Sequence, residues 1–359
     1  MKSNKLVLFF LVTIIVVIAA YVAASKRAPQ SSLEKTVLFP GLDRQINNVT
    51  KIVVSGQGKM VELVKDNGQW VLASSWHYPA LVNKVRAAVI NLSELKILDE
   101  KTDNPELYTR LGVEDPEQPD AASLLISLHD SNGNPLAELI VGQERLSSSS
   151  RPGLYVRKPG EHNALLVEGH LDLSASELDW FDRFLFDISA SRIKSIDIIF
   201  PDGDTFGIFK EAKEQPDFKT TDTQAASESA SKIIINRIAT GFEEMRADGI
   251  MSAENFEFPE ETVRTLASTF DGISIEARLA EIDGQTYGQF MVSGDPDFSG
   301  NTTNGQAETG LEAPSPANEI AALSRKLSGW VYLIPDFKYE ALTTTPESLR
   351  EAIPQPSEG

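Results

Sequence analysis

Residues suited to acid–base or metal chemistry are scarce in this chain. It has 359 residues, no cysteine and four histidines. Without cysteine it cannot form disulfides, thiolate nucleophiles, cysteine-ligated zinc, iron–sulfur sites or a lipid-modified N-terminal cysteine. No two of the histidines, His77, His129, His162 and His170, are spaced to share a helix face. The sequence therefore predicts no metal site built from them.

His77 is the most suggestive histidine because it lies in an aromatic stretch, residues 74–79. One interpretation is a loop that contacts a ligand. The alternative is that Trp76 and Tyr78 pack the loop onto a sheet while His77 is solvated, with Pro79 just ahead of a helix start. We favour the second interpretation.

Two pairs of carboxylates could offer oxygen ligands, Asp202 with Asp204 and Asp295 with Asp297. A calcium site needs about six oxygens. Turn formation therefore explains both pairs better. With 52 acidic residues in the chain, two distant carboxylates could still form a glycosidase site. A membrane-anchored envelope glycan hydrolase is accordingly kept as an alternative function.

Established catalytic and cofactor motifs do not occur in the sequence. It has no GxxxxGK[ST] phosphate loop, no GxGxxG after a strand, no HExxH and no GxSxG. Gly56-Gln57-Gly58 is interpreted as a turn, because a strand and not a helix N-terminus follows it. We predict no catalytic, cofactor-binding or metal-binding residues, no cofactor, and a protein that is not an enzyme.

The charge of the chain limits its partners. Its 52 acidic and 33 basic residues give a net charge of -19. A field of this sign repels nucleic acid and anionic lipid headgroups. We expect no nucleic-acid partner.

The N-terminal region predicts a membrane anchor over residues 1–27. Residues 6–24 form an apolar stretch, and a helix of this length covers roughly 29 Å, about the hydrocarbon thickness of a bilayer. Basic residues flank it on both sides, with a slight excess that favours a cytoplasmic N-terminus. A signal peptide cleaved after Ala24 is the alternative. In both cases the remaining chain is exported.

Residues 28–48 have no sustained periodicity and are interpreted as a tether. A first α+β unit is expected over 49–190. It opens with a three-stranded meander, indicated by alternating apolar pairs at Ile52/Val54, Val61/Leu63 and Trp70/Leu72. An amphipathic helix is predicted next, from a helically spaced stripe: Val82, Val85, Ala88, Val89, Leu92, Leu95.

Further antiparallel strands are expected after that helix. The runs 124–128 and 137–141 form a predicted hairpin around Ser131-Asn132-Gly133-Asn134. Residues 153–156 and 165–167 continue the sheet, and a short amphipathic helix over 178–185, starting at Ser174 or Ser176, closes the unit.

The same order of patterns recurs over 191–350, which predicts a second, similar unit. Helix-stripe residues Ile235, Ile238, Phe242 and Met245 each lie 150 residues after a stripe residue of the first unit. Residues 275–279 and 288–292 are matched to the earlier hairpin, and 329–335 to 153–159. Stretches 220–231 and 300–319 are predicted as mobile loops, and 351–359 as a frayed tail.

A short segment, Tyr108-x-x-Leu111-Gly112-Val113 followed by Asp115-Pro116, carries a family resemblance together with its surroundings. These are the single N-terminal span, Trp70, Ile140-Val141-Gly142 and residues 153–157. The pattern over about residues 1–190 resembles an uncharacterised family of membrane-anchored envelope proteins, with a domain of unknown function, encoded beside ABC transporter genes of the gliding-motility type. The resemblance implies a partner, the membrane subunit of an ABC-type transporter, and brings no catalytic residues.

The sequence thus predicts an α+β protein: an N-terminal transmembrane helix, then two similar β-rich units, each with a meander, an amphipathic helix and further antiparallel strands. We expect a single-pass protein of the inner membrane that contacts the bilayer through residues 6–24 and has its C-terminal region in the periplasm. The expected function is a non-enzymatic accessory or binding subunit of an envelope ABC-type transport complex. A ligand-binding module is a further alternative beside the hydrolase.

Overall fold

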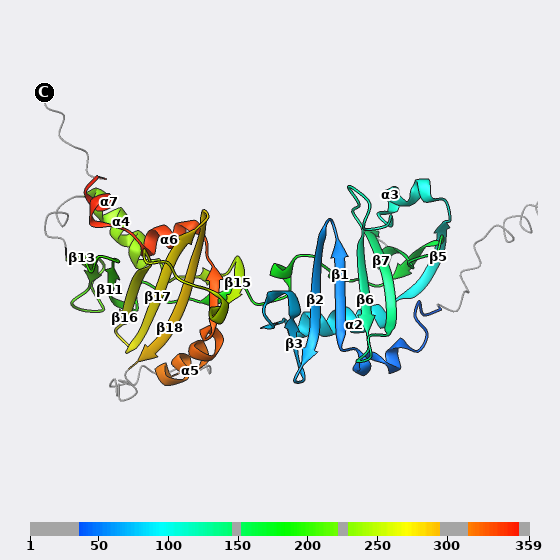
Figure 1. Cartoon of the computed structure of the whole chain (residues 1–359), viewed down its shortest axis with the longest axis horizontal. Coiled ribbons are helices and arrows are strands. Elements are labelled where there is room, and N and C mark those ends of the chain that lie inside the picture. Colours follow the sequence, from blue (N-terminus) through cyan, green and yellow to red (C-terminus); the bar gives the residue numbers. More distant parts are fainter. Residues whose placement is uncertain (1–35, 146–151, 222–228, 295–314, 352–359) are drawn as a thin grey trace, which may run out of the picture. The chain divides into compact units, whose positions relative to one another are not determined.

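The computed structural model describes residues 36–145, 152–221, 229–294 and 315–351 (Figure 1). Antiparallel sheets dominate this part of the chain and helices are few, which confirms the expected strand-rich mixture of α and β structure. Among the described residues, no helix is both long enough and apolar enough to cross a bilayer. The predicted span, residues 6–24, lies outside them.

The first sheet has nine strands in the order β4-β3-β2-β1-β6-β7-β8-β9-β5. Its meander, hairpin and later strands fall where the alternating patterns predicted them. The strands are β1 (Lys51–Gly56), β2 (Lys59–Asp66), β3 (Gln69–Leu72), β4 (Tyr78–Pro79), β5 (Lys96–Thr102), β6 (Leu124–His129), β7 (Pro135–Arg145), β8 (Gly153–Arg157) and β9 (Ala164–Glu168).

The second sheet has eight strands in the order β13-β12-β11-β16-β17-β18-β19-β15, and β10 pairs separately with β14. These strands are β10 (Phe184–Phe186), β11 (Ile193–Ile199), β12 (Thr205–Phe209), β13 (Lys219–Thr220), β14 (Met245–Arg246), β15 (Gly249–Ser252), β16 (Val263–Thr269), β17 (Ile273–Ile282), β18 (Gln285–Gly294) and β19 (Trp330–Leu333).

Both sheets have the same strand order once β4 is set aside, since β3-β2-β1-β6-β7-β8-β9-β5 matches the second sheet strand for strand. The correspondence extends to the segment ahead of each sheet. Val37 forms a bridge with Lys96, and Phe184 pairs with Arg246 in the same way.

This order corrects two expected matches. The hairpin β6–β7 corresponds to β16–β17, not to residues 275–279 and 288–292, which belong to β17 and β18. In the same way β19 corresponds to β9, not to 153–159. The sequence obscured β16 because its buried positions include Thr265 and Ala267, which give a weak apolar alternation.

One helix follows each meander in the chain: α2 (Val82–Glu94) in the first half and α4 (Ser229–Ala239) in the second. Most predicted stripe positions are buried: Val85, Ala88, Val89, Leu92, Leu95, Ile235, Ile238, Phe242 and Met245. Val82, at the start of α2, is instead 37% exposed. The second predicted stripe also runs past its helix, because α4 ends at Ala239 and Met245 belongs to β14. The remaining helices are α3 (Tyr108–Leu111), α5 (Pro316–Leu327), α6 (Asp336–Leu342) and α7 (Pro346–Glu351).

Two predicted segments have a different structure. Of the expected tether 28–48, residues 36–48 belong to the fold, because Leu38 and Leu42 are buried. The short helix expected over 178–185 is instead one 3₁₀ turn, η5 (Glu177–Asp179), followed by β10. Backbone pairing of Phe184 and Phe186 with β14 favours a strand there.

The chain divides into two compact units. The first contains the described residues up to Met60 together with Arg86–Ala175, and the second contains Val61–Val85 together with the described residues from Ser176 onward. These bounds differ from the expected 49–190 and 191–350. Of the expected mobile loops and tail, residues 222–228, 300–314 and 352–359 lie outside the described part, while α5 begins at Pro316, inside the expected loop 300–319.

Candidate functional site

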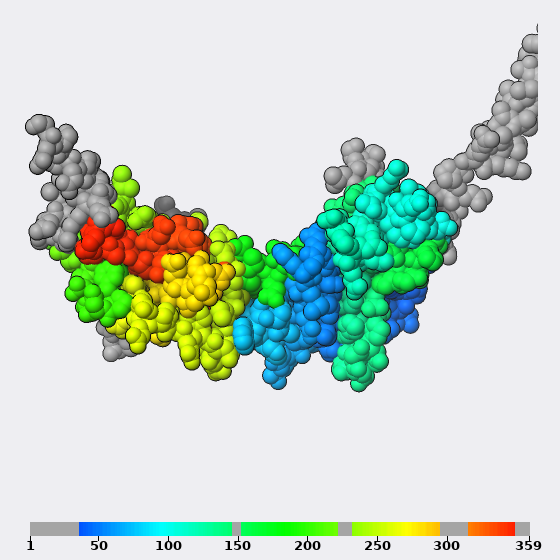
Figure 2. All heavy atoms as spheres, turned by 45° about the horizontal axis from the view of Figure 1, so that its top comes forward, coloured from blue at the N-terminus to red at the C-terminus, as the bar shows by residue number. Residues whose placement is uncertain are grey.

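The connection from β5 to β6 folds back over the outward face of the first sheet. It contains α3, which ends at Gly112 in a left-handed conformation with φ of 65°. Tyr108 and Val113 form a buried cluster there with Ile140 and Ala164 of the sheet. Figure 2 shows this cyan segment lying against the green strands. The connection thus closes one part of the sheet surface.

Arg157, on β8, holds this connection in place with a buried guanidinium group. Its Nε donates to the Val113 carbonyl at 2.9 Å, and its Nη2 donates to Asp115 Oδ1 at 2.6 Å. The guanidinium carbon also lies 4.6 Å from the centre of the Tyr108 ring. Such stacking and fork-shaped donation are typical of arginine rather than lysine. We call Tyr108, Val113, Gly142 and Arg157 the Arg157 clamp.

Gly142 belongs to the clamp because no side chain fits at its position. A Cβ atom there would lie 2.4 Å from the Leu111 carbonyl oxygen and 2.7 Å from that of Gly112. Three of the segments that carried the family resemblance, 108–115, 140–142 and 153–157, therefore meet at this place and pack against one another.

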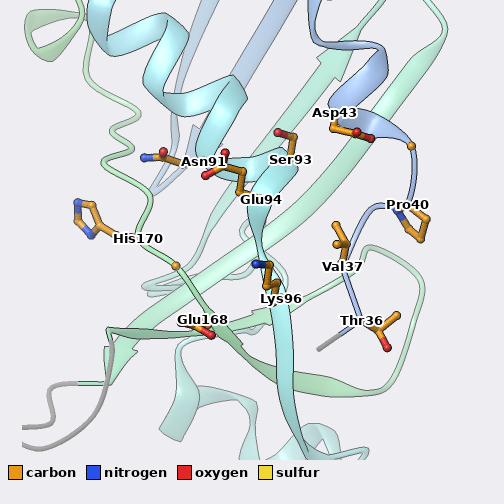
Figure 3. Close-up of a pocket in the computed structure, with 12 residues that line it drawn as sticks. Thr36, Val37, Pro40, Asp43, Asn91, Ser93, Glu94, Lys96, Glu168 and His170 are labelled. Atoms are coloured by element: carbon orange, nitrogen blue, oxygen red, sulfur yellow. The ribbon is translucent and has the colours of Figure 1, made fainter. Parts of the chain in front are cut away.

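A separate pocket of about 860 Å³ opens at the end of α2 (Figure 3). Three segments surround it: the last turn of α2 with the start of β5, the chain that enters the fold, and the residues that follow β9. The lining residues are Thr36, Val37, Pro40, Gly41, Asp43, Asn91, Ser93, Glu94, Lys96, Glu168, Gly169 and His170.

Backbone hydrogen bonds fix the walls of the pocket. The Leu38 amide donates to the Leu95 carbonyl at 2.8 Å, and the Ile97 amide donates to the Thr36 carbonyl at 2.9 Å. Gly169 approaches Leu95 so closely that a Cβ atom on it would lie 2.4 Å from a Leu95 methyl carbon. The pocket is therefore preformed by the scaffold.

Negative charge prevails around this pocket. Asp43 and Glu94 are exposed and Glu168 is half-buried, against the single ammonium group of Lys96. His170 at the rim is held by Glu144, with 2.5 Å between Nδ1 and Oε1. The C-terminal end of α2 adds a partial negative charge. This environment favours a cationic group.

The predicted role of the aromatic loop is correct in part. Tyr78 is buried, and His77 is exposed with its Nδ1 3.4 Å from an oxygen of Asp66. Trp76, however, is 47% exposed and not buried as Tyr78 is. The left-handed φ of 56° at Trp76 and of 61° at His77 turn the chain sharply at this point.

The structure does not bring the other singled-out residues together. His129 lies beside the β6–β7 turn, 3.4 Å from the Gly133 carbonyl oxygen, and the His162 carbonyl accepts from Tyr108 at 2.5 Å. In the described part of the chain no three potential metal-ligating side chains cluster.

The interpretation of the loop carboxylates and glycines as turn formers is confirmed where it can be examined. The Asp204 amide donates to Asp202 Oδ1 at 3.0 Å. Residues 56–58 connect the antiparallel neighbours β1 and β2. Asp295 and Asp297 lie outside the described residues.

Sequence reasoning missed the pocket because residues 36–48 were interpreted as a tether. A signal was present: Leu38-Phe39 recurs as Leu185-Phe186, and each pair enters its half of the fold beside the segment that follows the helix.

Comparison with known proteins yields one match. No curated protein and no solved structure matches the chain. A family model described as a domain of unknown function, DUF4340, matches residues 70–257. The match begins at Trp70, at the start of β3, and continues beyond the expected limit near 190 to the connection between β15 and β16. Since it covers more than half of the chain, the protein belongs to the DUF4340 family of domains of unknown function.

Proposed function

We propose that this protein is a non-enzymatic accessory or binding subunit of an envelope ABC-type transport complex. In this proposal residues 6–24 cross the inner membrane once and the folded region lies in the periplasm. The apolar stretch in the sequence supports the anchor. The resemblance of the Tyr108 segment and its surroundings to envelope proteins encoded beside transporter genes supports the partner.

The observation that carries the binding role is the preformed, open pocket at the end of α2. Its walls are fixed by backbone bonds between Leu38 and Leu95 and between Ile97 and Thr36, so binding needs little ordering of the protein. Its charged groups Asp43, Glu94 and Lys96 are exposed to water. Charge stabilisation in catalysis is strongest where water is excluded, so this pocket is better suited to holding a ligand group.

The Arg157 clamp supports the same conclusion. The residues of the most distinctive motif pack against one another, and the Arg157 side chain donates to the Val113 carbonyl and to Asp115. We therefore interpret the residues of the Arg157 clamp as holding the β5–β6 connection on the sheet. The pocket remains the better candidate for ligand binding.

Co-purification tests the proposal. The full chain, tagged after Gly359, is extracted from membranes in mild detergent, and the proteins recovered with it are identified. We expect membrane and ATP-hydrolysing subunits of one transporter. A chain without residues 6–24 serves as the control and should lose them. Recovery of no transporter subunit with the intact chain would contradict the proposed complex.

The topology is tested independently. A reporter that is active only outside the cytoplasm, fused after Gly359, should be active, and the chain should keep its full mass on a gel. An inactive but stably expressed reporter would reverse the orientation. A loss of about 24 residues would instead favour the cleaved signal peptide.

A further inference from the structure

In the second half a buried lysine is bound at the turn that follows α4. Lys338 of α6 is only 8% exposed, and its Nζ donates to the carbonyls of Thr240 at 2.9 Å and Glu243 at 2.6 Å. These carbonyls belong to that turn. The ammonium group therefore occupies the negative end of the helix.

Residues 90–94 and 240–244 occupy matched positions, although 90–94 form the last turn of α2 and 240–244 form the turn that follows α4, which ends at Ala239. Stripe residues 150 positions apart are buried in both, as for Leu92 with Phe242 and Leu95 with Met245. The same spacing relates Ile90 to Thr240, Ser93 to Glu243 and Glu94 to Glu244. The carbonyls that bind Lys338 thus correspond to those of Ile90 and Ser93.

Acidic side chains surround both helix ends. Burial lowers the pKa of Lys338, and the nearby charges of Glu243, Glu244 and Asp187 oppose that effect. In the first half, Glu94 is the counterpart of Glu244, and Asp43 and Glu168 add carboxylates around the pocket. Both helix ends therefore present acidic groups around the terminal carbonyls.

What differs is the chain that follows the last strand. After β19, Pro335 leads directly into α6, which carries Lys338. After β9, residues 169–176 contain no helix, and α2 ends at the pocket (Figure 3). The hydroxyl of Ser93 donates to the Ile90 carbonyl at 2.7 Å. That contact takes the place of one of the two Lys338 bonds.

We infer that the pocket at the end of α2 receives an ammonium group, the side chain of a lysine supplied by a partner protein, in the way that Lys338 occupies the end of α4. This inference deepens the proposed binding role and rests on it. It does not depend on which complex the protein joins. The partner is expected to present the lysine on an exposed turn or helix, because the pocket is open on one side.

The test uses the full chain in detergent micelles and two short capped peptides, acetyl-Gly-Lys-Gly-amide and its norleucine analogue, which keeps the alkyl chain and lacks the charge. Binding is followed by saturation-transfer NMR on the peptide signals. We expect the lysine peptide to bind at least about tenfold more tightly than the norleucine peptide. Equal binding of the two peptides, or no binding of either, would overturn the inference.

Matched charge reversals locate the site. Glu94→Lys places an ammonium group at the pocket and should abolish lysine binding, whereas Glu100→Lys, on the exposed part of β5 outside the pocket, should leave it unchanged. Asp43→Asn, at the opposite wall, should weaken binding without reversing a charge. Circular dichroism checks that each variant is folded. Equal loss in the Glu94 and Glu100 variants would show nonspecific attraction and reject the site.

The results separate this inference from the proposed function. Lysine binding that depends on Glu94, together with no recovered transporter subunit, would support the pocket and contradict the complex. Recovery of transporter subunits together with no lysine binding would support the complex and reject the ammonium site.

Discussion

The two sheets share their strand order but differ on their outward faces. In the first sheet, neighbouring positions on β6, β7 and β8 are Leu125, Ile140 and Arg157, and Tyr108 and Val113 of the β5–β6 connection form a cluster with Ile140 against which Leu125 packs. The corresponding row on β16, β17 and β18 is Arg264, Arg278 and Gln289. Arg264 is exposed, and Arg278 and Gln289 are half-buried.

The length of one connection accounts for this difference. Residues 103–123 join β5 to β6 and contain α3, whereas only 253–262 join β15 to β16. The shorter connection also packs on its sheet. The Arg278 guanidinium carbon lies 4.5 Å from the centre of the Phe258 ring, and the Phe256 ring lies 4.7 Å from that of Phe258 and 5.0 Å from that of Tyr287, but these aromatic side chains remain half-buried. The core faces thus determine the strand order that the two sheets share. The outward faces differ because the connections that lie over them differ in length.

Exchanging residue types between the two rows should break the comparison most strongly. Ile140→Arg would bury a charge among Tyr108, Val113 and Ala164, and we expect it to lower the free energy of unfolding by about 3–5 kcal/mol. Arg278→Ile, at the corresponding position, should change it by less than about 1 kcal/mol. Urea denaturation followed by circular dichroism measures both. Similar losses in the two variants would mean that the outward faces are equally covered.

Truncation of the helix stripes tests whether the two cores are equivalent. Leu92 and Phe242 are fully buried at matched positions, and we expect Leu92→Ala to cost about 2–5 kcal/mol and Phe242→Ala about 3–5 kcal/mol. Ile90→Ala, on the exposed side of α2, is the control and should cost less than about 1 kcal/mol. A small effect at only one of the two buried sites would show that the halves are packed differently.

Sequence periodicity predicted the elements whose two faces differ in polarity. The strands at Ile52, Val61 and Trp70 and the two helices were found, because one side of each faces the core, although α4 ends at Ala239 and not near Met245 as the stripe predicted. The predictions were wrong where tertiary contacts decide the conformation. Residues 178–185 have the apolar content of an amphipathic helix, but pairing of Phe184 and Phe186 with β14 makes the end of that segment a strand.

The candidate pocket is formed by residues whose proximity in space could not be predicted from a single sequence. Thr36, Glu94 and Glu168 are far apart in the chain and meet only through the pairing of β5 with β9 and with the entering segment. The correspondence of Glu94 with Glu244 followed from the helix stripes. The position of Lys338 at the end of α4 did not, because it depends on how α6 packs after β19.

A smaller loss of stability is expected where the β5–β6 connection packs on the first sheet. Gly142→Ala would place a methyl group against the Leu111 and Gly112 carbonyls and push the connection away, and we expect a loss of about 1–3 kcal/mol. Gly249→Ala on β15 is the comparison, since its Cβ atom would meet only the Leu333 side chain, at 3.2 Å, and no backbone atom. If the two variants unfold at the same urea concentration, the connection does not press against Gly142.

The smallest predicted effect concerns Asp197, on the less covered outward face of the second sheet. Partial burial raises the pKa of its carboxyl group above 3.8, and the facing position is Gly207, where a Cβ atom would lie 2.7 Å from Oδ1. A raised folded-state pKa means that the folded chain binds the proton more tightly than the unfolded chain. This contribution to stability is complete below the unfolded pKa and is lost as the pH rises through the folded value, so the ionised carboxylate destabilises the fold at neutral pH.

Asp197→Asn should therefore raise the melting temperature slightly at pH 7, and the gain should shrink as the pH falls toward about 4. Thermal unfolding at several pH values measures this, with Asp103→Asn on an exposed connection as the control. A gain that is independent of pH would show that the effect comes from packing at Gly207 and not from the charge.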